Sequence, residues 1–523
     1  NTVIGNIPEL DAATLQDVRA FHRSHYRTDN AVLVVAGDFD NQAVDRWIDQ
    51  TFGAIPTPKP RSTAQRPPEP PRTRPLRHTI TGPNIPLPAV AVNYLTPDVR
   101  SDERHVLTLL DGILASGKAS RLYRELVQRQ QVASESVSWI DLRSDAGLLQ
   151  IRTVAAQGVA PERLENAIEQ LIADLRENLV PETELARVRN RLLTDELKSR
   201  ETVDGIASLL GDAMVHHDDP SWADRQWEVL SQVTPEQLRD TARRCLTPQN
   251  RITVVGTRGP APTTPRSKPS PTSTADNTPI PPPDQKPPRP GRPSAPATKR
   301  PTRTKLANQL TVLHTPKPGS GLVSIAIGIP YGAALDPSGQ FGRAALMADV
   351  MTRGTALRNS EQIAADAEAL GGTVNARAGR DDIRFSITVP ASRCEPALEL
   401  LAEIVRRPRF APADVVKARN ERTDAASIEL QDPGSIAALA VAKRVYANSP
   451  QGNPVDGLPT TLGRIQRNDL IGLWTKAFRP DDTVLVVAGD CTAESVFGIA
   501  QKHIGTWKPS HAPRPTNPAP SRS

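Results

Sequence analysis

The 523-residue sequence is poor in cysteine and in aromatic residues, and each shortage excludes a class of protein. Its three cysteines, Cys245, Cys394 and Cys491, show neither the spacing of a disulfide framework nor that of a structural zinc site. Aromatic residues make up 4% of the chain, which leaves few rings for stacking on nucleic-acid bases. No apolar run approaches the roughly 20 residues that cross a bilayer, so no transmembrane segment is expected.

Positive charge is concentrated in one segment of the chain, whose formal net charge is +6. Residues 260–301 contain seven Lys and Arg against two Asp, a net charge of +5, so the remainder carries about +1. A basic linker without a basic folded face argues against nucleic acid as a partner. One alternative is that this segment itself binds nucleic acid or acidic partners, which predicts salt-sensitive binding.

Proline marks the boundaries between folded regions. Residues 260–301 hold 15 of the 51 prolines, a composition that buries too little apolar area to offset its ordering entropy and favours an extended tether. Two shorter stretches have a similar proline-rich, polar composition. The sequence therefore predicts folded regions at 1–56, 78–259 and 303–509, joined or followed by linkers at 57–77, 260–302 and 510–523.

One helix-turn-strand unit occurs three times. Seven of eight residues in 31–38 recur in 483–490, and a weaker copy occupies 234–256. A period of more than 200 residues is too long for a solenoid and indicates duplicated domains.

Between the linkers, hydrophobic periodicity predicts the same order of elements twice. The predicted strands are 89–94, 147–155, 322–329 and 383–389. The predicted helices include 101–117, a long charged helix 181–210, a helix 340–352, a Ser360-capped helix that ends at Gly371-Gly372, and a helix 398–405. Because strands and helices do not alternate as βαβ units, we predict an α+β fold: two-layer domains, each a mostly antiparallel sheet with helices on one face.

Several short motifs in a fixed order resemble the M16 (pitrilysin/insulinase and mitochondrial-processing-peptidase-like) zinc metallopeptidase family. They cover the chain outside its Pro-rich stretches: Gly5-Asn6-Ile7-Pro8, Thr14-Leu15-Gln16-Asp17-Val18, Phe21-His22, Tyr26-Arg27, Asn30 to Asp38, Phe52 to Pro56, Gly117 with Ser120-Arg121-Leu122-Tyr123, Gly354-Thr355, Leu370 to Ala376, and Asp432-Pro433-Gly434-Ser435. The resemblance implies a clamshell of two halves, each made of two similar α+β domains. On that pattern 1–56 is the tail of a first domain, 78–259 a second and 303–509 a third, so the sequence is expected to be an internal piece of a longer chain.

The resemblance also implies a His-x-x-Glu-His motif, in which two imidazoles on one helix face hold Zn²⁺ and the Glu takes a proton from bound water. This sequence contains no such motif. In the third domain, its two His positions fall on Ala345 and Asp349, its Glu position on Ala348, and the downstream Glu ligand on Ala425 or Ala426. We therefore expect neither a catalytic nor a metal-binding residue in this chain, and we expect the family's Zn²⁺ upstream of Asn1.

Other candidate constellations favour structural roles. His22 and His25 have i, i+3 spacing but no nearby carboxylate at the right offset, so they predict a packed helix end. The run His216-His217-Asp218-Asp219 predicts a solvated helix terminus, because adjacent side chains diverge. Ser120-Arg121-Leu122-Tyr123 suits capping and interface packing, since no His is placed as its base. The glycines of Gly371-Gly372 and Gly37-Asp38 lack phosphate-loop spacing and predict a helix stop and a strand exit.

Two functional hypotheses follow from the resemblance. The first is a zinc metalloendopeptidase that cleaves peptides or unfolded proteins, whose halves pack on each other and allow a dimer. The second is a non-catalytic partner or core subunit. No substrate-binding residue is carried over. Periplasmic location or export is implied by the family alone, because no basic-then-apolar leader follows Asn1. An incomplete first domain would leave apolar surface near Val32 and Val34 exposed, which favours association.

Overall fold

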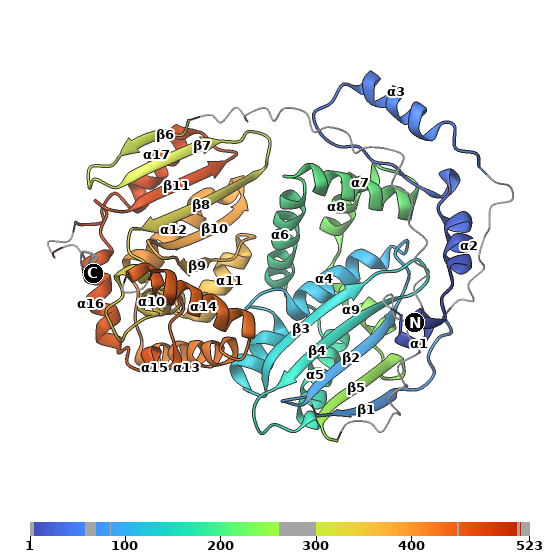
Figure 1. Cartoon of the computed structure of the whole chain (residues 1–523), viewed down its shortest axis with the longest axis horizontal. Helices are drawn as coiled ribbons and strands as arrows, with labels where there is room; N and C mark the ends of the chain where they lie inside the picture. Colours follow the sequence, from blue (N-terminus) through green and yellow to red (C-terminus); the bar gives the residue numbers. More distant parts are fainter. Residues whose placement is uncertain are drawn as a thin grey trace.

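The structure is a computed structural model of the chain, and it describes residues 5–57, 69–83, 85–260, 300–446, 449–509 and 513. Two units lie next to each other, each a sheet with helices packed along it (Figure 1). The predicted linkers at 260–302 and 510–523 fall largely outside the described residues, as do positions 58–68 of the one at 57–77. The end of that linker was placed too late, because β1 begins at Leu76. None of the helices in the described ranges has the length and apolarity needed to cross a bilayer.

The N-terminal unit, residues 76–258, is a five-stranded sheet in the order β1-β5-β2-β4-β3. The edge strand β1 pairs parallel to β5, and every other pairing is antiparallel. A short π-helix, Tyr123–Arg129, precedes β3. The elements are β1 (Leu76–Gly82), β2 (Ala89–Thr96), α4 (Glu103–Ala115), β3 (Ala133–Asp141), β4 (Gly147–Ala155), α5 (Pro161–Glu177), α6 (Glu182–Ser199), α7 (Val203–His217), α8 (Trp222–Gln232), α9 (Pro235–Cys245) and β5 (Arg251–Arg258).

The C-terminal unit, residues 302–503, repeats this arrangement with one more edge strand, in the order β6-β7-β11-β8-β10-β9. Here β7 takes the place of β1, because it pairs parallel to β11. The elements are β6 (Thr302–Lys305), β7 (Thr311–Pro316), β8 (Leu322–Ile329), α10 (Arg343–Met351), α11 (Ser360–Ala369), β9 (Asn375–Ala378), β10 (Ile383–Pro390), α12 (Cys394–Arg406), α13 (Pro412–Glu429), α14 (Pro433–Tyr446), α15 (Pro459–Leu462), α16 (Arg467–Ala477), β11 (Val484–Gly489) and α17 (Ala493–His503).

Each unit buries one face of its sheet under its helices, as the predicted α+β fold requires. In β2 every second residue is buried, and α4 contributes an apolar stripe to the same core. In the C-terminal unit β8, β10 and β11 alternate in the same way against α10 and α12. Alternation with period two on strands, facing a helix stripe, is what a two-layer packing needs.

Two details of the predicted helices are wrong. The single helix predicted at 181–210 is two helices, α6 and α7, because Thr202 starts a new helix by accepting a hydrogen bond from the backbone N–H of Gly205. The cap of α11 is Asn359 rather than Ser360, since the Asn359 side chain accepts from the N–H of Gln362 in a reciprocal capping box.

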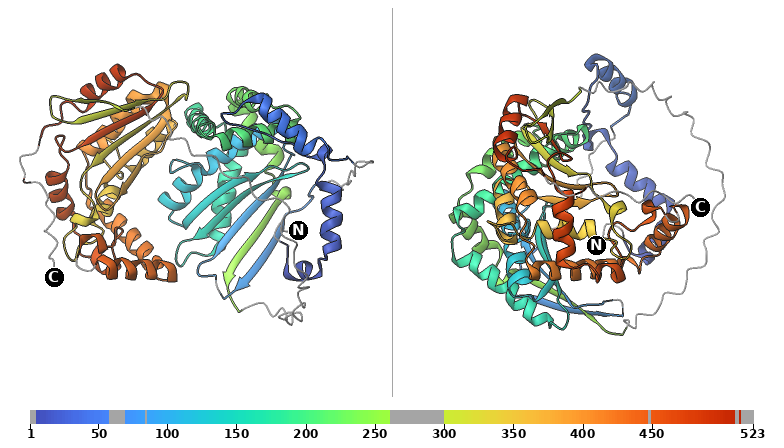
Figure 2. Two further views of the ribbon diagram at one scale, coloured as in Figure 1. Left: turned by 45° about the horizontal axis from the view of Figure 1, so that its top comes forward. Right: turned by 90° about the vertical axis from the view of Figure 1, so that its left-hand side faces the viewer.

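The N-terminal segment differs most from its prediction. It forms α1 (Ile7–Ala12), α2 (Leu15–His25) and α3 (Asn41–Phe52), which lie along the outside of the N-terminal unit and bury none of their residues (Figure 2). The strand predicted over 31–36 does not form. Val32 and its neighbour Leu33 are exposed, as the prediction of uncovered apolar surface requires, whereas Val34 is half-buried near Gly211 of α7.

Candidate functional site at the degenerate metal position and the seam between units

The helix α10, on which the resemblance places the metal motif, is firmly anchored at its start. Gly342 adopts φ +91°, and the buried Asp336 carboxylate accepts hydrogen bonds from the N–H groups of Gly342 and Ala344 at 3.0 and 3.1 Å. Burial raises the pKa of Asp336 to about 6, although those backbone donors favour its charged form. A carboxylate at a helix N-terminus also complements the helix dipole, so the orientation of α10 is fixed.

The residues at the motif positions do not fit a zinc ion. Ala345 and Ala348 are fully buried in the core of the unit, and their methyl groups offer no lone pair. Asp349 keeps a carboxylate, but Arg353 donates to both of its oxygens at 3.1 Å and Arg422 lies 3.5 Å away. Zinc needs three protein ligands of N, O or S type, and one carboxylate already shared by two guanidinium groups cannot supply them.

The downstream ligand position lies on α13, which packs against α10. Of the two candidate positions, Ala426 is buried and Ala425 is exposed, and neither side chain can bind a metal. The carboxylate of Glu421 on the same helix accepts from Arg353 at 2.6 Å, which completes an ion-pair cluster. Within the described ranges no group of three His, Cys, Asp or Glu residues is close enough to hold a metal ion.

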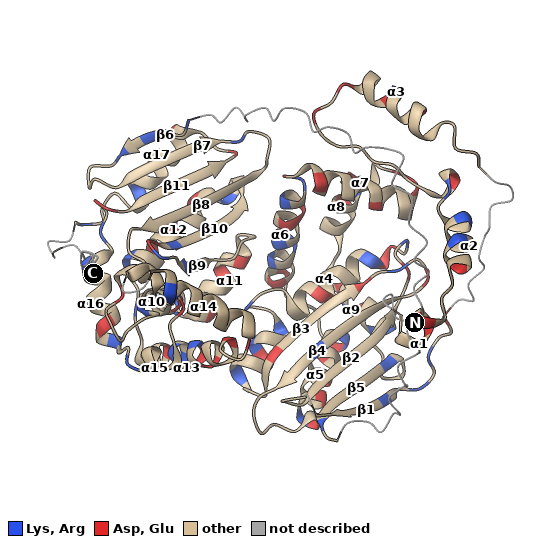
Figure 3. Ribbon diagram, in the orientation of Figure 1, with Lys and Arg blue, Asp and Glu red and all other residues tan. Residues whose placement is uncertain are grey.

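A seam joins the two units where α6 packs on α11. Glu368 of α11 is 2% exposed, and its carboxylate accepts from Arg187 of α6 at 2.5 Å and from the N–H of Ala119 at 3.2 Å. Three more hydrogen bonds join the two units. Asn190 donates to the carbonyl of Ala369, Arg191 donates to Thr373, and Lys317 donates to the carboxylate of Glu201 just beyond α6. Acidic and basic residues alternate along α6 (Figure 3), so charged groups of both signs border this contact.

Glycines from two of the sequence motifs allow this close approach. A Cβ on Gly117 would lie 2.1 Å from Oε1 of Glu368, and a Cβ on Gly371 would lie 2.6 Å from the hydroxyl of Thr194. Both glycines also have positive φ, +84° and +86°. The predicted helix stop at Gly371-Gly372 is confirmed, because α11 ends at Ala369 and both glycine N–H groups bond back to its last turn. The contact with α6 is an additional role that the sequence did not predict.

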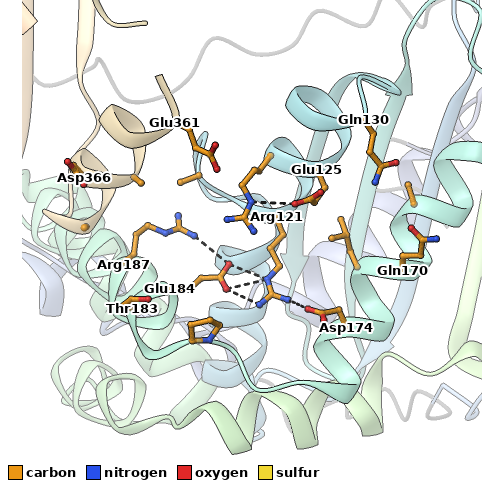
Figure 4. A pocket seen from close by; sticks show the side chains of 17 residues that line it. Arg121, Glu125, Gln130, Gln170, Asp174, Thr183, Glu184, Arg187, Glu361 and Asp366 are labelled. Carbon is orange, nitrogen blue, oxygen red and sulfur yellow. Dashed lines mark hydrogen bonds and ion pairs between the residues drawn. The ribbon is translucent and has the colours of Figure 1, made fainter. Parts of the chain in front are cut away.

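A cavity of about 660 Å³ opens on one flank of α11 and holds the motif residue Arg121. Figure 4 shows Arg121 reaching between Asp174 of α5 and Glu184 of α6, at 2.6 and 2.8 Å. Ser120 donates to the carbonyl of Gly117 at 2.7 Å. The predicted packing role of Ser120-Arg121-Leu122-Tyr123 therefore agrees with the contacts that these side chains make.

A second cavity, of about 240 Å³, lies on another flank of α11. It is bordered by Arg353 and Glu421 of the ion-pair cluster and by Tyr123 of the N-terminal unit. Burial, and then the nearby Glu421 carboxylate, raise the pKa of Tyr123, so its hydroxyl stays protonated at neutral pH. The degenerate metal position thus borders a cavity that both units line.

The two histidine pairs singled out in the sequence are occupied by local contacts. His25 stacks on Phe21 and His22 stacks on Tyr26, with ring centroids 4.2 and 4.9 Å apart. The rings pack only on one another and stay exposed, so the predicted packed helix end is wrong: no other part of the described chain covers this end of α2.

The other pair lies at the end of α7. His217 stacks on Trp222 at 4.4 Å, and its Nε2 lies 2.6 Å from a guanidinium nitrogen of Arg104. Burial, and then Arg104, lower the pKa of His217. The carbonyl of His216 accepts from Arg100. The surrounding arginines repel a cation, so this site does not suit a metal ion. The prediction of a solvated helix terminus is wrong for His217, whose ring packs on Trp222.

The seam pair is the feature that sequence reasoning missed. Arg187 and Glu368 stand 181 positions apart, and nothing in their local sequence marks them as partners. The only available signal was an Arg and a Glu at core-facing positions of their helices, where an unpaired charge is costly.

Family models match most of the sequence. The model described as the peptidase M16 inactive domain matches residues 12–192 and 464–523, and the model of the insulinase family, peptidase family M16, matches residues 311–457. The chain belongs to the M16 peptidase family. The insulinase match includes α10, the helix on which the resemblance places the metal motif.

Curated relatives of this M16 chain are named zinc proteases. Zinc protease PqqE of Helicobacter pylori is 26% identical over 255 residues, which cover 46% of this chain and 56% of the relative. A zinc protease of Rickettsia felis is 24% identical over 205 residues, covering 39% of this chain and 50% of the relative. The chain spans about half the length of these curated relatives.

Solved structures similar to this M16 chain include a protease from Helicobacter pylori, with TM-score 0.46, 23% identity, and coverage of 49% of this chain and 62% of that one. Another is the periplasmic protease PqqL from Escherichia coli, with TM-score 0.41, 14% identity, and coverage of 99% of this chain and 60% of that one.

Proposed function

We propose that this chain is part of an M16-type zinc metalloendopeptidase that hydrolyses peptides or unfolded proteins, with its zinc site in residues outside this sequence. In this proposal the C-terminal unit is catalytically silent, and both units form scaffold and chamber wall. The observation that carries it is the replacement of the metal ligands on α10 by Ala345 and by Asp349, whose carboxylate is held by Arg353. The names of the relatives support zinc at the level of the family.

The same proposal assigns the segments. Residues 1–56 are the tail of a first M16 domain, 78–259 a second domain and 303–509 a third, with linkers at 57–77 and 260–302 and a further one beginning at 510. Support comes from the repeated strand order of the two sheets and from the unpaired copy of the repeat unit at 31–36. Export to the periplasm and packing of the two halves as a closed chamber remain predictions of the family resemblance.

A second candidate is a non-catalytic M16 partner or core subunit. The ion pairs of Asp349 with Arg353 and Arg422 favour it, because they stabilise the packing around α10 and leave no carboxylate free to bind a metal there. The two candidates agree on the 523-residue chain and differ on the protein to which it belongs.

The deciding experiment measures zinc content and peptide cleavage for that whole protein, purified from its source, beside the 523-residue chain. We expect about one zinc per whole protein, cleavage of a peptide library that a chelator abolishes, and neither property in the 523-residue chain. A whole protein without zinc or chelator-sensitive cleavage would establish the non-catalytic candidate. Stoichiometric zinc in the 523-residue chain, lost on Asp349→Ala, would contradict both.

A further inference from the structure

The smaller seam cavity is lined by residues of both units, which are cationic, acidic and apolar. Its cationic residues are Lys118 from the turn before Ser120, Arg191 of α6, and Arg353 and Lys417 of the C-terminal unit. Its acidic residues are Glu368 and Glu421. Its apolar wall includes Ile363, Ala364 and Val374. Tyr123 and Ser360, which carry hydroxyl groups, also line it.

Most of these charges are already neutralised within the protein. Glu368 is bound to Arg187, and Glu421 to Arg353. Lys118 and Lys417 differ, because neither makes an ion pair or hydrogen bond with any residue that the structure describes. Arg191 only donates to Thr373 and stands 3.9 Å from Asp195. The surplus of positive charge at the cavity therefore comes from Lys118 and Lys417, which are exposed to solvent at its border.

Hydrogen-bond donors without partners accompany this charge. Tyr123 and Ser360 line the cavity, and no hydrogen bond joins the hydroxyl of either to another residue of the described ranges. Ser360 lies in the first turn of α11, where the helix dipole also favours an anion. Cations and hydroxyl donors from separate elements therefore border one cavity.

The larger cavity shows why this one is distinctive. There Arg121 is bound by Asp174 and Glu184, and Arg187 stands 3.8 Å from the same Glu184, so both guanidinium groups have carboxylate partners within the walls (Figure 4). Its lining carboxylates outnumber its arginines, so it offers no surplus of positive charge. Of the two cavities beside α11, only the smaller is lined by more cationic than acidic residues.

We propose that the smaller cavity binds the free C-terminal carboxylate of a short peptide, with the last side chain against Ile363, Ala364 and Val374. A volume of about 240 Å³ holds little more than one terminal residue, and an apolar wall beside cations suits a carboxylate attached to an aliphatic side chain. Charge-assisted hydrogen bonds to the lysines and hydroxyls supply the recognition. The site needs no metal and is independent of where the zinc of the proposed peptidase lies.

The test is fluorescence anisotropy at low ionic strength with the 523-residue chain and a short, N-terminally fluorescein-labelled peptide that ends in valine. The free acid is expected to bind about tenfold more tightly than the same peptide with a C-terminal amide, since one charge-assisted contact is worth roughly that factor. Added salt weakens the binding of the free acid. Equal binding of acid and amide would overturn the proposal.

Variants locate the site. Lys118→Ala and Lys417→Ala are each expected to weaken binding of the free acid about three- to tenfold. The matched control is Lys476→Ala, an exposed helical lysine on α16 outside the cavity, which leaves binding unchanged. Ala364→Phe fills the cavity and abolishes binding, with the melting temperature reporting that the chain still folds. Full affinity in the folded Lys118→Ala/Lys417→Ala double variant would refute the assignment.

Competition separates a peptide site from a general anion site. N-acetylvaline is expected to displace the labelled peptide at lower concentration than inorganic phosphate at matched ionic strength, because only the former contacts the apolar wall. Equal potency of the two competitors would contradict a site for peptide termini.

Discussion

The segment from Leu15 to Gly37 and the segment from Arg467 to Gly489 begin in the same way and end differently. Both start with an 11-residue helix whose first turn is closed by an aspartate at the third helical position, Asp17 or Asp469. Both then form a bidentate ion pair across two residues: Arg27 with Asp29 at 2.8 Å, and Arg479 with Asp481 at 2.8 and 2.9 Å. Up to this point the two copies have the same local structure.

Beyond the ion pair, only one copy becomes a strand. Residues 484–489 form β11, which pairs parallel to β7 and antiparallel to β8. Residues 32–37 have the same sequence but no ladder partner in the described chain. A strand has no hydrogen bonds of its own, whereas a capped helix and a short ion pair close within a few residues. Matched substitutions in equivalent places therefore separate what the local sequence does from what its surroundings do.

The largest expected difference concerns one leucine. Leu485 is 0% exposed in the core of the C-terminal unit, whereas the equivalent Leu33 is 56% exposed. Leu485→Ala is expected to lower the free energy of unfolding by about 2–5 kcal/mol, since it leaves a cavity in a packed core. Leu33→Ala is expected to change it by less than about 0.5 kcal/mol. Denaturant unfolding of both variants measures the difference.

Similar losses in the two variants would mean that residues 31–36 are packed as well as β11 is. That result would remove the contrast between the copies, and hydrogen exchange of their amide groups would show it independently.

The next difference concerns the glycine that ends each copy. Gly489 and Gly37 have nearly the same φ, +145° and +149°. A Cβ on Gly489 would lie 2.2 Å from the carbonyl oxygen of Leu322, whereas a Cβ on Gly37 would meet only a ring carbon of Phe39, at 4.0 Å. Gly489→Ala is expected to destabilise the chain by about 1–3 kcal/mol more than Gly37→Ala, because backbone of β8 must move. Thermal melting compares the two, and equal shifts would attribute the whole effect to backbone strain.

The smallest expected difference is between alanine substitutions of two glycines, one at the seam and one away from it. Gly117 and Gly158 have similar φ, +84° and +78°, so alanine strains the backbone equally at both. Only at Gly117 does the new methyl group displace the Glu368 carboxylate, since nothing lies within 4 Å of a Cβ on Gly158. We expect Gly117→Ala to cost about 1–2 kcal/mol more and to loosen the contact between units.

Small-angle X-ray scattering is the direct measurement of that loosening. The radius of gyration should rise for Gly117→Ala and stay unchanged for Gly158→Ala, because interfaces between units are small and depend on a few contacts. Unchanged scattering from a folded Gly117→Ala variant would show that Glu368 is not needed to hold the seam.

Hydrophobic periodicity predicted many of the helices and strands, but it did not predict the strands that pair only with distant parts of the chain. Strands 147–155 and 322–329 were predicted at the bounds that the structure has, because their alternation and flanking turns are strong signals. The edge strand β1 and its counterpart β7, which β6 flanks, were missed. Their pairing is parallel to strands more than 170 positions away, which no local pattern reports.

Some features of the candidate site could also be predicted from the sequence, and others could not. That Ala345 and Ala348 cannot bind zinc follows from their chemistry alone. That Asp349 is also unsuitable depended on Arg353 and Arg422, and the contribution of Arg422 comes from another helix. The hydrogen bond between Arg187 and Glu368, and the cavities beside it, exist only because two duplicated units come together at α6 and α11.

The sequence by itself determined the duplication, the capped helices, the turns and the lack of a His-x-x-Glu-His motif in these 523 residues. These depend on residue chemistry and on contacts that close within a few positions, where little chain entropy opposes them. Tertiary structure alone decided which copies of the repeated unit join a sheet, which charges are paired across the seam and which lysines border a cavity without a partner among the described residues. Those outcomes require groups far apart in the chain to meet, and identical residues behave differently when their partners are present in one place and missing in another.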